Sequence, residues 1–508
     1  MARFGCWTWG FLAACAAVLL GNKTLAEEAA AMKPRYEIAY ASYFGGSDGE
    51  EAREIIPYPD GSVLVAGQTR SPDLPTTPGV FQPTYGNAQL ARSDPEFRSG
   101  DCFLLRLSPD GSRMLQATYF GGSKQERAVY GMELDSEGNI VIASATRSTD
   151  LPITPGCFCP EYRWAHNGFA AKLSADFKRL LWCTYLGFWP RGGLALDGKD
   201  NVCIVGSTSS PDFPTTEGVL KRTMSGTTQA VILKLTADGT RPVFSTFFGG
   251  GVEAPAGQGE EIPGVRVDAE GNIYVAGHSR SPNLPVTEGA FQAKPRGESD
   301  AFVAKLSSDA SRVLYATYLG GSRHEFAEHR LFLGEDGTVL LTGATASPDF
   351  PTTEGAFQRR LGGESDGFLA KVSGDGRRLL FSTLFGGRGP DFLLMPTPDA
   401  EGNIFVVGST ASPDLPTTPD ALQRNYGGGE ADGMLAMFSP DGAKLIYATY
   451  LGGSGDELIR SLALGPRGEI YLVGRTSSKD FPVTPSAFQT KYGGGDSDAF
   501  IVKLVPKG

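Results

Sequence analysis

The amino-acid sequence predicts an all-β fold, a seven-bladed β-propeller with four antiparallel strands in each blade. The main observation is an internal repeat, in which the phrase Tyr-Leu-Gly-Gly or a close variant occurs seven times among 508 residues. Successive copies are 76, 66, 62, 71, 66 and 66 residues apart. A period of this size indicates one supersecondary unit that was copied and that buries its apolar face against its neighbours. The copies begin at Tyr43, Tyr119, Tyr185, Phe247, Tyr318, Leu384 and Tyr450.

Each unit contains four strand-like runs, which we name a, b, c and d in chain order. In the last unit, strand a is expected at 459–464, strand b at 470–474 and strand c at 499–504. The preceding unit gives an example of strand d at 445–451. These runs are rich in β-branched and aromatic residues and are separated by clusters of Asp, Gly, Asn and Pro. Four antiparallel strands per unit are typical of a propeller blade.

The two ends of the repeat predict how the ring closes. The seventh unit stops after its strand c at Leu504, whereas the repeat region begins with an unpartnered strand d at 38–44. The N-terminal strand can therefore complete the last blade. Closure of this kind removes the exposed edges that an open array of strands would have.

The repeat gives the expected boundaries of the chain. A signal peptide at 1–26 and a linker at 27–35 precede a single domain at 36–506. Within that domain, 36–44 supplies strand d of blade 7. The seven blades are then expected at 45–120, 121–186, 187–248, 249–319, 320–385, 386–451 and 452–506.

The first 26 residues have the composition of a secretory signal. Arg3 supplies the positive end, 10–20 form a short apolar core, and Ala26 ends a cleavage site. We therefore expect a secreted, periplasmic or cell-surface protein. Residues 12–15 also match a lipoprotein box ending at Cys15, but an apolar run follows the cysteine where a polar tether is usual, so lipidation is the less favoured alternative.

The charge balance narrows the class of partner. The formal net charge is −11, and removal of the signal, which carries Arg3 and Lys23 and no acid, lowers it to −13. An acidic surface repels phosphate backbones, which argues against nucleic acid as a partner. After the signal, no segment is long and apolar enough to cross a membrane.

Five cysteines follow the signal region. An odd number spread over such a long chain does not indicate a disulfide framework. Cys102, Cys183 and Cys203 lie in strand-like runs and are expected to pack as small apolar side chains. Cys157 and Cys159 stand one residue apart in a loop, and the sequence does not decide their pairing.

Three stretches resemble the bacterial seven-bladed beta-propeller repeat (SBBP) family. They are the turn-and-strand segment 270–277, the loop Ser-Pro-Asp-Phe-Pro-Thr-Thr at 210–216 and 347–353, and the strand 299–306. The resemblance covers nearly the whole mature chain. It implies the propeller fold and an extracytoplasmic binding or scaffolding role, without a shared catalytic motif.

The loop between strands b and c carries Asp-x-Pro-x-Thr in six blades. Asp satisfies backbone N–H groups in turns and Pro stiffens the residue at its own position, so we expect a structural role. Residues 484–489, Thr-Pro-Ser-Ala-Phe-Gln, predict one turn of helix with Thr484 as its cap and Pro at the first helical position.

The loop between strand d and the next strand a carries an acid in five blades. If strand a is innermost, these acids would surround the mouth of the central channel, where a ring of carboxylates could hold a hydrated cation such as calcium. Alternatively, each acid pairs with an arginine (Arg53, Arg127 or Arg460) or caps backbone N–H groups. Calcium is the one cofactor that the sequence suggests. The acids are Glu50, Glu126, Glu325, Asp391 and Glu457.

A function private to one blade must lie where one copy departs from the others. The clearest departure is in blades 2 and 3, where the b-to-c loop contains Tyr-Arg-Trp and the next d-to-a loop replaces Gly-Gly-Ser with Phe-Trp-Pro-Arg. Aromatic faces beside arginines form a platform for a sugar, a peptide or another flat ligand. The alternative is that the aromatic residues fill a gap left by lost glycines. The predicted ligand-binding residues are Tyr162, Arg163, Trp164, Phe188, Trp189 and Arg191.

We recognise no catalytic residues in the sequence. Gly45–Gly49 matches Gly-x-Ser-x-Gly but lies between strands instead of between a strand and a helix. The sequence therefore favours a non-catalytic module that binds an extracellular protein, peptide or glycan through its loop face. The alternative is a propeller enzyme, a lyase or glycan hydrolase, with its site at the channel mouth. A glycan hydrolase needs two carboxyl groups at a set separation in one site. The acids of this chain mostly recur from blade to blade, so we attribute them to the fold and favour binding over catalysis.

Overall fold

The computed structural model describes residues 35–86, 100–163, 167–252, 260–327 and 330–507. Every regular element in these ranges is a β-strand. The predicted signal peptide, Cys15 and the linker up to residue 34 lie outside them. None of the described residues forms a helix that could cross a membrane.

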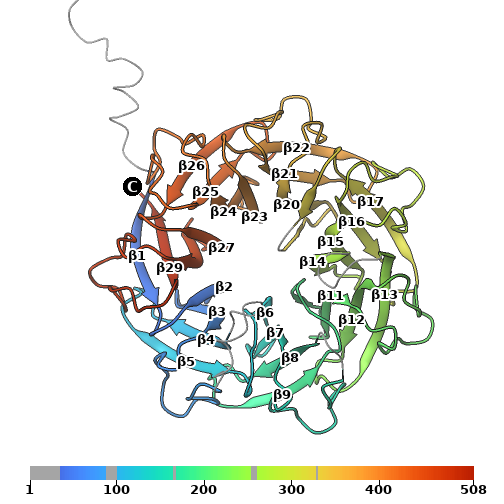
Figure 1. Cartoon of the computed structure of the whole chain (residues 1–508), viewed down its shortest axis with the longest axis horizontal. Helices are drawn as coiled ribbons and strands as arrows, with labels where there is room; N and C mark the ends of the chain where they lie inside the picture. The colour runs from blue at the N-terminus through green and yellow to red at the C-terminus, as the bar shows by residue number, and fades with distance from the viewer. Residues whose placement is uncertain (1–34, 87–99, 164–166, 253–259, 328–329, 508) are drawn as a thin grey trace, which may run out of the picture.

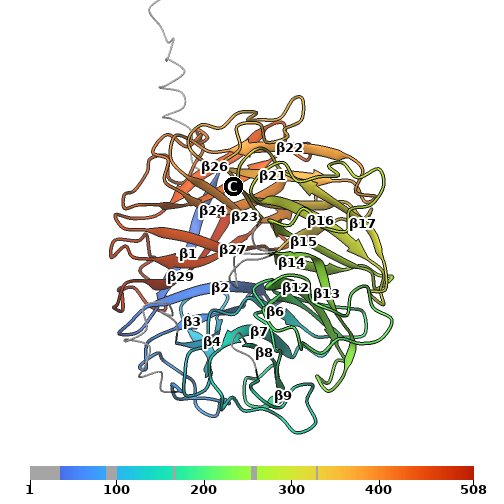
Figure 2. The same cartoon turned by 45° about the vertical axis from the view of Figure 1, so that its right-hand side comes forward.

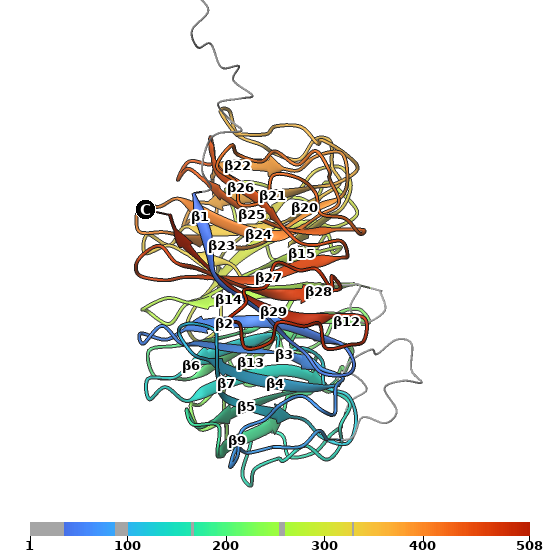
Figure 3. The same cartoon turned by 90° about the vertical axis from the view of Figure 1, so that its left-hand side faces the viewer.

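Seven antiparallel sheets surround a central axis (Figure 1), which confirms the seven-bladed β-propeller. The oblique and side views show a disc whose strands run between two loop-bearing faces (Figures 2 and 3). The strands of blades 1 to 4, in the order a to d, are β2 (Glu50–Pro57), β3 (Val63–Thr69), β4 (Asp101–Leu107), β5 (Met114–Phe120); β6 (Gly131–Leu134), β7 (Ile140–Thr146), β8 (Asn167–Leu173), β9 (Leu180–Tyr185); β10 (Leu194–Leu196), β11 (Val202–Thr208), β12 (Thr228–Leu235), β13 (Pro242–Val252); β14 (Glu261–Val267), β15 (Ile273–Ser279), β16 (Asp300–Leu306), β17 (Val313–Leu319).

Strand a of blade 5 is split in two, because β18 and β19 both pair with β20. The strands of blades 5 to 7 are β18 (Glu325–Ala327) with β19 (Phe332–Leu333), β20 (Val339–Thr345), β21 (Asp366–Val372), β22 (Leu379–Phe385); β23 (Asp391–Pro398), β24 (Ile404–Thr410), β25 (Asp432–Phe438), β26 (Leu445–Leu451); β27 (Glu457–Leu464), β28 (Ile470–Thr476), β29 (Asp498–Pro506), β1 (Tyr36–Phe44).

The first strand closes the ring as predicted. The sheet of blade 7 has the order β1-β29-β28-β27, and β1 pairs antiparallel with β29 from Tyr36↔Pro506 to Phe44↔Ala499. Figure 1 shows the blue β1 beside the red β29. The blade therefore joins the two ends of the chain through backbone hydrogen bonds and not through a covalent link.

The hydrophobic core lies between neighbouring blades. One cluster, for example, combines Leu64 and Leu104 of blade 1 with Ile142 and Phe169 of blade 2, all fully buried. Because each blade contributes only part of such a cluster, no blade can bury its apolar surface alone.

The repeated tyrosine and glycines have separate structural causes. The Tyr119 hydroxyl donates to the carbonyl of Ser71 at 2.9 Å, and four other copies make the equivalent bond. A Cβ on Gly122 would overlap the side chains of Ser148 and Asp150 in the b-to-c loop. A glycine is required here because the loop packs against the backbone, not because the turn needs a positive φ.

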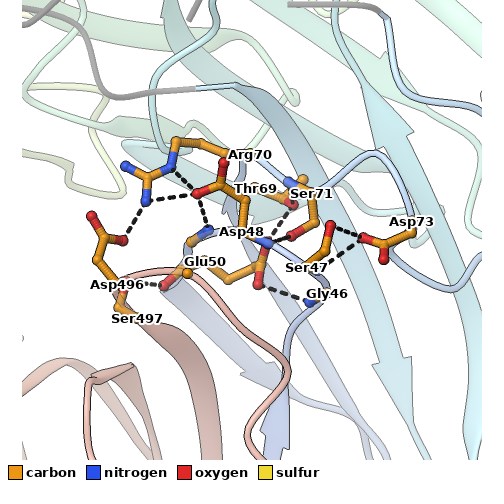
Figure 4. A network of polar contacts seen from close by, with 12 residues as sticks. Gly46, Ser47, Asp48, Glu50, Thr69, Arg70, Ser71, Asp73, Asp496 and Ser497 are labelled. Carbon is orange, nitrogen blue, oxygen red and sulfur yellow. Dashed lines mark hydrogen bonds and ion pairs between the residues drawn. The ribbon is translucent and has the colours of Figure 1, made fainter. Parts of the chain in front are cut away.

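The Asp of Asp-x-Pro-x-Thr binds the preceding d-to-a loop. Asp73 Oδ1 accepts hydrogen bonds from both the backbone N–H and the hydroxyl of Ser47, each at 2.9 Å (Figure 4). Asp150 accepts the N–H of Ser123 in the same way. The predicted structural role of this motif is confirmed.

Residues 484–489 form one hydrogen-bonded turn, in which the Ala487 N–H donates to the carbonyl of Thr484 at 3.1 Å, but this turn is not the helical one that the sequence predicts. A helix would require the Phe488 N–H to reach the carbonyl of Thr484. That N–H instead donates to the carbonyl of Gly111 in blade 1 at 2.9 Å, while the Thr484 N–H donates to Ala41 of the outer strand. Contacts with the neighbouring strand and blade therefore replace the helical bonds.

Each outer strand d contains a β-bulge at the same step. In blade 1, Arg106 pairs with Gln116 and Leu107 with Met114, so Leu115 is left without a cross-strand partner and is 37% exposed. The register skips one residue at the same step in the other six blades. The bulged residues are Ala39, Leu115, Leu181, Val243, Leu314, Leu380 and Ile446.

We expect Gly408→Ala to destabilise the protein by at least about 1–3 kcal/mol, the usual range for overpacking a core. A Cβ on Gly408 would overlap the backbone carbonyl oxygen of Phe392 in the adjacent strand, and backbone cannot move aside as a flexible side chain can. Urea unfolding measures the change. Gly198→Ala is the matched control, because nothing lies within 4 Å of its Cβ position. We expect it to change stability by less than about 0.5 kcal/mol. Equal effects of the two substitutions would contradict this explanation.

Candidate functional site: the mouth of the central channel

The innermost strands begin around the channel on the face that carries the d-to-a and b-to-c loops (Figure 1). Two consecutive positions opposite the last two residues of each strand b define the candidate site, and in blades 1, 5, 6 and 7 they are also the first two residues of strand a. The first position holds the repeated acid in blades 1, 2, 5, 6 and 7. The residue that follows it occupies the second position.

The five predicted acids are buried and lie apart from one another. Each is at most 2% exposed. Glu50 Oε2 accepts the N–H of Gly46 at 2.9 Å, and its Oε1 accepts the hydroxyl of Thr69 at 2.7 Å (Figure 4). Glu126, Glu325, Asp391 and Glu457 accept the N–H four residues before them in the same way.

The expectation that these acids together surround the mouth is therefore wrong, and the alternative role in capping backbone N–H groups is confirmed. Glu260 makes the corresponding bonds to Gly250 and Gly251 in blade 4. In the part of the chain that the structure describes, no three His, Cys, Asp or Glu side chains are grouped so that they could hold a metal ion.

The junction between blades 7 and 1 shows how these loops tie neighbouring blades together. Arg70 forms ion pairs with Asp48, at 3.1 Å, and with Asp496 of blade 7 (Figure 4). The backbone N–H of Glu50 donates to the carbonyl of Ser497 at 2.8 Å. The d-to-a loop of one blade is thus attached to the b-to-c loop of the blade before it.

Phe188 takes the first position in blade 3, where the d-to-a loop is shorter. The next residue, Trp189, forms a bridge with Ser207, as Glu51 pairs with Gln68 in blade 1. Phe188 is fully buried, and its ring packs edge-on against Phe213 at 5.6 Å. It fills the space of the missing acid and offers no surface to a ligand, so for this residue the gap-filling alternative is correct.

Trp189 occupies the second position and lies between two arginines. The Arg127 guanidinium is 4.4 Å from the centre of its ring and the Arg191 guanidinium is 5.4 Å away. Arg191 also forms an ion pair with Glu261 of blade 4 at 2.9 Å. The half-buried indole is thus the centre of a group that spans blades 2, 3 and 4. We call Arg127, Trp189, Arg191 and Glu261 the tryptophan cluster.

The other predicted ligand-binding residues have different surroundings. Tyr162 is half-buried and packs edge-on against Tyr185 at 5.6 Å. Arg163 is exposed and pairs with Glu161 at 3.0 Å. Trp164 lies outside the described residues. Among the predicted residues that the structure describes, Trp189 and Arg191 are brought together, and they are joined by Arg127, which was not predicted to bind a ligand.

The remaining second positions divide the mouth into two halves. Blade 1 contributes Glu51, so the second positions of blades 1, 2 and 4 hold charged side chains and that of blade 3 holds Trp189. Blades 5, 6 and 7 contribute apolar side chains instead, of which Phe326 is 42% exposed. The apolar half consists of Phe326, Phe392 and Leu458.

Arg330 crosses the channel below the mouth. From blade 5 it forms ion pairs with Glu54 of blade 1 at 2.9 Å and with Glu133 of blade 2 at 3.1 Å. It also donates to the carbonyl of Met132 at 2.8 Å. Burial, partly offset by Arg330, raises the pKa of Glu54 to about 7. The sequence did not predict this cross-channel contact, because Arg330 is at least 197 residues away in the chain from each of its partners.

The five cysteines that follow the signal region are buried free thiols. Burial raises the pKa of Cys102, Cys183 and Cys203, which agrees with their expected role as small apolar side chains. Cys157 and Cys159 are not bonded to each other.

No protein-family model matches the chain, and no curated protein matches it. Solved structures that resemble it include a protein of unknown function from Dyadobacter fermentans, with 12% identity, a TM-score of 0.40, and coverage of 93% of this chain and 100% of that one. BamB from Moraxella catarrhalis has 12% identity, a TM-score of 0.40, and coverage of 92% and 100%. A quinohemoprotein alcohol dehydrogenase from Pseudomonas putida has 11% identity, a TM-score of 0.37, and coverage of 93% and 76%.

Proposed function

We propose that this propeller is a non-catalytic binding module that recognises an extracytoplasmic peptide, protein or glycan at the channel mouth. The observation that carries the proposal is the tryptophan cluster. It stands in blade 3, where the repeated d-to-a loop is replaced. Two guanidinium groups over an indole place charged hydrogen-bond donors beside an aromatic ring, which suits an acidic ligand group.

The opposite half of the mouth supports the same proposal. Phe326, Phe392 and Leu458 give an apolar surface facing the same opening as the charged half. A ligand with both an apolar and an acidic part, such as a peptide segment, would match both halves. The acidic net charge of −11 keeps nucleic acid out of the proposal.

The channel carboxylates favour binding over the alternative of a lyase or glycan hydrolase. Glu54 and Glu133 are paired with Arg330, and Glu261 is paired with Arg191. Glu51 is paired with Arg460. General acid–base catalysis needs a carboxyl group within reach of the substrate. Burial raises the pKa of Glu54 to about 7, but this side chain is only 4% exposed and is bound to Arg330, which limits the access of a substrate.

We expect Trp189→Ala to weaken ligand binding by at least about tenfold, the loss typical of a central aromatic contact. Glycan and peptide arrays probed with the mature chain, residues 27–508, identify the ligand, and calorimetry compares the variants. The fold should persist, because Trp189 holds its place through backbone bonds with Ser207 at 2.9 and 3.1 Å.

Arg163→Ala is the matched control, since Arg163 is exposed and its ion pair with Glu161 is a local one. It should leave affinity within twofold of the wild type. A collapse of the melting temperature in Trp189→Ala would assign the indole to packing. Unchanged affinity in a folded Trp189→Ala variant would refute the proposed site.

A further inference from the structure

Five of the seven junctions between blades contain two buried carboxyl groups that face each other. One belongs to the first residue of a strand c, and the other to the first position in the next blade. All ten side chains are at most 2% exposed. The pairs are Asp498 and Glu50, Asp101 and Glu126, Asp300 and Glu325, Asp366 and Asp391, and Asp432 and Glu457.

The first glycine of the repeated phrase lies between the two carboxyl groups. A Cβ on Gly121 would overlap Oε2 of Glu126 and also Oδ1 of Asp101. Gly386 has the same relation to Asp391 and Asp366. In these two pairs both carboxyl groups therefore lie close to the same point beside the glycine backbone.

One oxygen of the Asp101–Glu126 pair is buried without a hydrogen-bond partner among the described residues. Asp101 Oδ2 accepts the N–H of Gly86 at 2.7 Å and the Gln82 amide at 3.2 Å, whereas Asp101 Oδ1 accepts nothing. The equivalent oxygen of Asp300 accepts the N–H of Gly297 at 2.9 Å. Asp101 Oδ1 and Glu126 Oε2 lie 2.8 and 2.4 Å from the point that a Cβ on Gly121 would occupy. A buried carboxylate oxygen without a donor is costly, and a second carboxylate beside it raises the cost.

The two junctions without an acid pair have an amide in strand c. Where Phe188 replaces the acid, strand c begins with Asn167, whose Oδ1 accepts the N–H of Gly187 at 2.8 Å. Opposite Glu260 the chain has Gln229, which donates to the carbonyl of Gly249 at 2.9 Å. The Asp therefore occurs only where a second acid faces it.

We infer that the Asp101–Glu126 pair binds at least one proton near pH 7, which the two carboxyl groups share, and that this proton holds blades 1 and 2 together. A shared proton turns one member of the pair into a donor and satisfies the unpartnered oxygen of Asp101. It also removes one of two buried like charges.

The surroundings of the Asp101–Glu126 pair agree with a bound proton. Burial, with a contribution from Asp101, raises the pKa of Glu126 to about 8, and burial raises the pKa of Asp101 to about 7. The other titratable groups that interact with the pair are Tyr85, Tyr119, Tyr185, Cys102 and Cys183. Burial raises the pKa of each of them, so all five are neutral near pH 7.

The sign of the pH dependence follows from these shifts. The folded-state pKa is higher than the unfolded value, so the pair contributes its full stability below the unfolded pKa of about 4. That contribution decreases as pH rises through the folded values, about 7 and about 8 for this pair. The propeller is therefore most stable in mildly acidic solution, and its blades loosen in alkaline solution.

The test compares the mature chain with its Asp101→Asn variant by urea unfolding from pH 5 to pH 9 in the presence of EGTA. The variant copies the amide that the chain itself has at Asn167, and it retains an oxygen for the Gly86 N–H. The unfolding equilibrium constant of the wild type should rise with pH more steeply than that of the variant, by up to about tenfold per pH unit. Glu54 also has a raised pKa, but it is present in both proteins and its effect cancels.

An infrared spectrum of the wild type at pH 7 gives a second measurement that does not depend on how well the variant folds. Protonated carboxyl groups should absorb in the native protein and not in the unfolded protein at the same pH. Parallel pH profiles of wild type and variant, or no protonated carboxyl signal at pH 7, would overturn the inference. A calcium-dependent rise in melting temperature that Glu126→Gln abolishes would also overturn it, because a cation would then occupy the place of the proton.

Discussion

A chain that begins at residue 45, and so lacks β1, is expected to lose cooperative unfolding. The strand supplies Tyr40, Tyr43 and Phe44 to the core, each at most 1% exposed. Truncation of one buried aromatic side chain typically costs about 3–5 kcal/mol, so the loss of all three exceeds the stability of most domains. Circular dichroism during thermal unfolding measures the loss.

A synthetic peptide of residues 35–47 should restore the cooperative transition when it is added to the truncated chain. The same peptide with Tyr43→Ala is the matched control and should fail, since it lacks the ring that packs against Phe481 and the hydroxyl that donates to Ser478. A chain that begins at residue 35 keeps β1 and should unfold like the mature protein. If the truncated chain unfolds cooperatively without any peptide, β1 is dispensable for closure.

Arg330→Ala is expected to lower the free energy of unfolding by about 3–5 kcal/mol, because it leaves the buried carboxylate of Glu54 without its ion-pair partner. Glu133 retains Arg266 at 4.0 Å. Glu54 is 4% exposed and Glu133 28%, so solvent compensates poorly for the loss at Glu54. The cost should be smaller at pH 5 than at pH 8. Burial already raises the pKa of Glu54 to about 7, and at low pH a proton can neutralise it in place of the arginine.

Arg163→Ala is the control for the loss of an ion pair as such. Its pair with Glu161 is 58% and 67% exposed, and exposed pairs contribute about 0–1 kcal/mol. The double variant Arg330→Met and Glu54→Gln should recover most of the lost stability, because no unpaired charge remains at the Glu54 site. Equal stabilities of the Arg330→Ala and Arg163→Ala variants would show that the cross-channel contact does not contribute.

The sequence was sufficient to predict the architecture, because each copy of the repeat shows the same local pattern of strands and turns. Strand lengths, the seven copies and the unpartnered strand at 38–44 follow from patterns that lie within one unit or at its ends. The role of the repeated Asp, as in Asp73, was also predictable, since its partner Ser47 lies in the same blade.

The site was less predictable because its contacts join different blades. Glu126 was expected at the mouth, but its surroundings depend on Asp101 of the preceding blade. Phe188 appeared to be a free aromatic residue, yet the register of strand a places it in the buried first position. Arg330 meets Glu133 across 197 residues, a separation at which no local pattern carries information.

The bulge in each outer strand reduces the tendency of the protein to aggregate at high concentration. A straight edge strand presents a continuous row of N–H and C=O groups, on which a strand from another molecule can add and begin a fibre. A bulge interrupts that row and increases the local twist. All seven rim strands are interrupted at the same step, so the propeller can keep aliphatic residues such as Leu115 and Leu314 in water without offering a template for polymerisation.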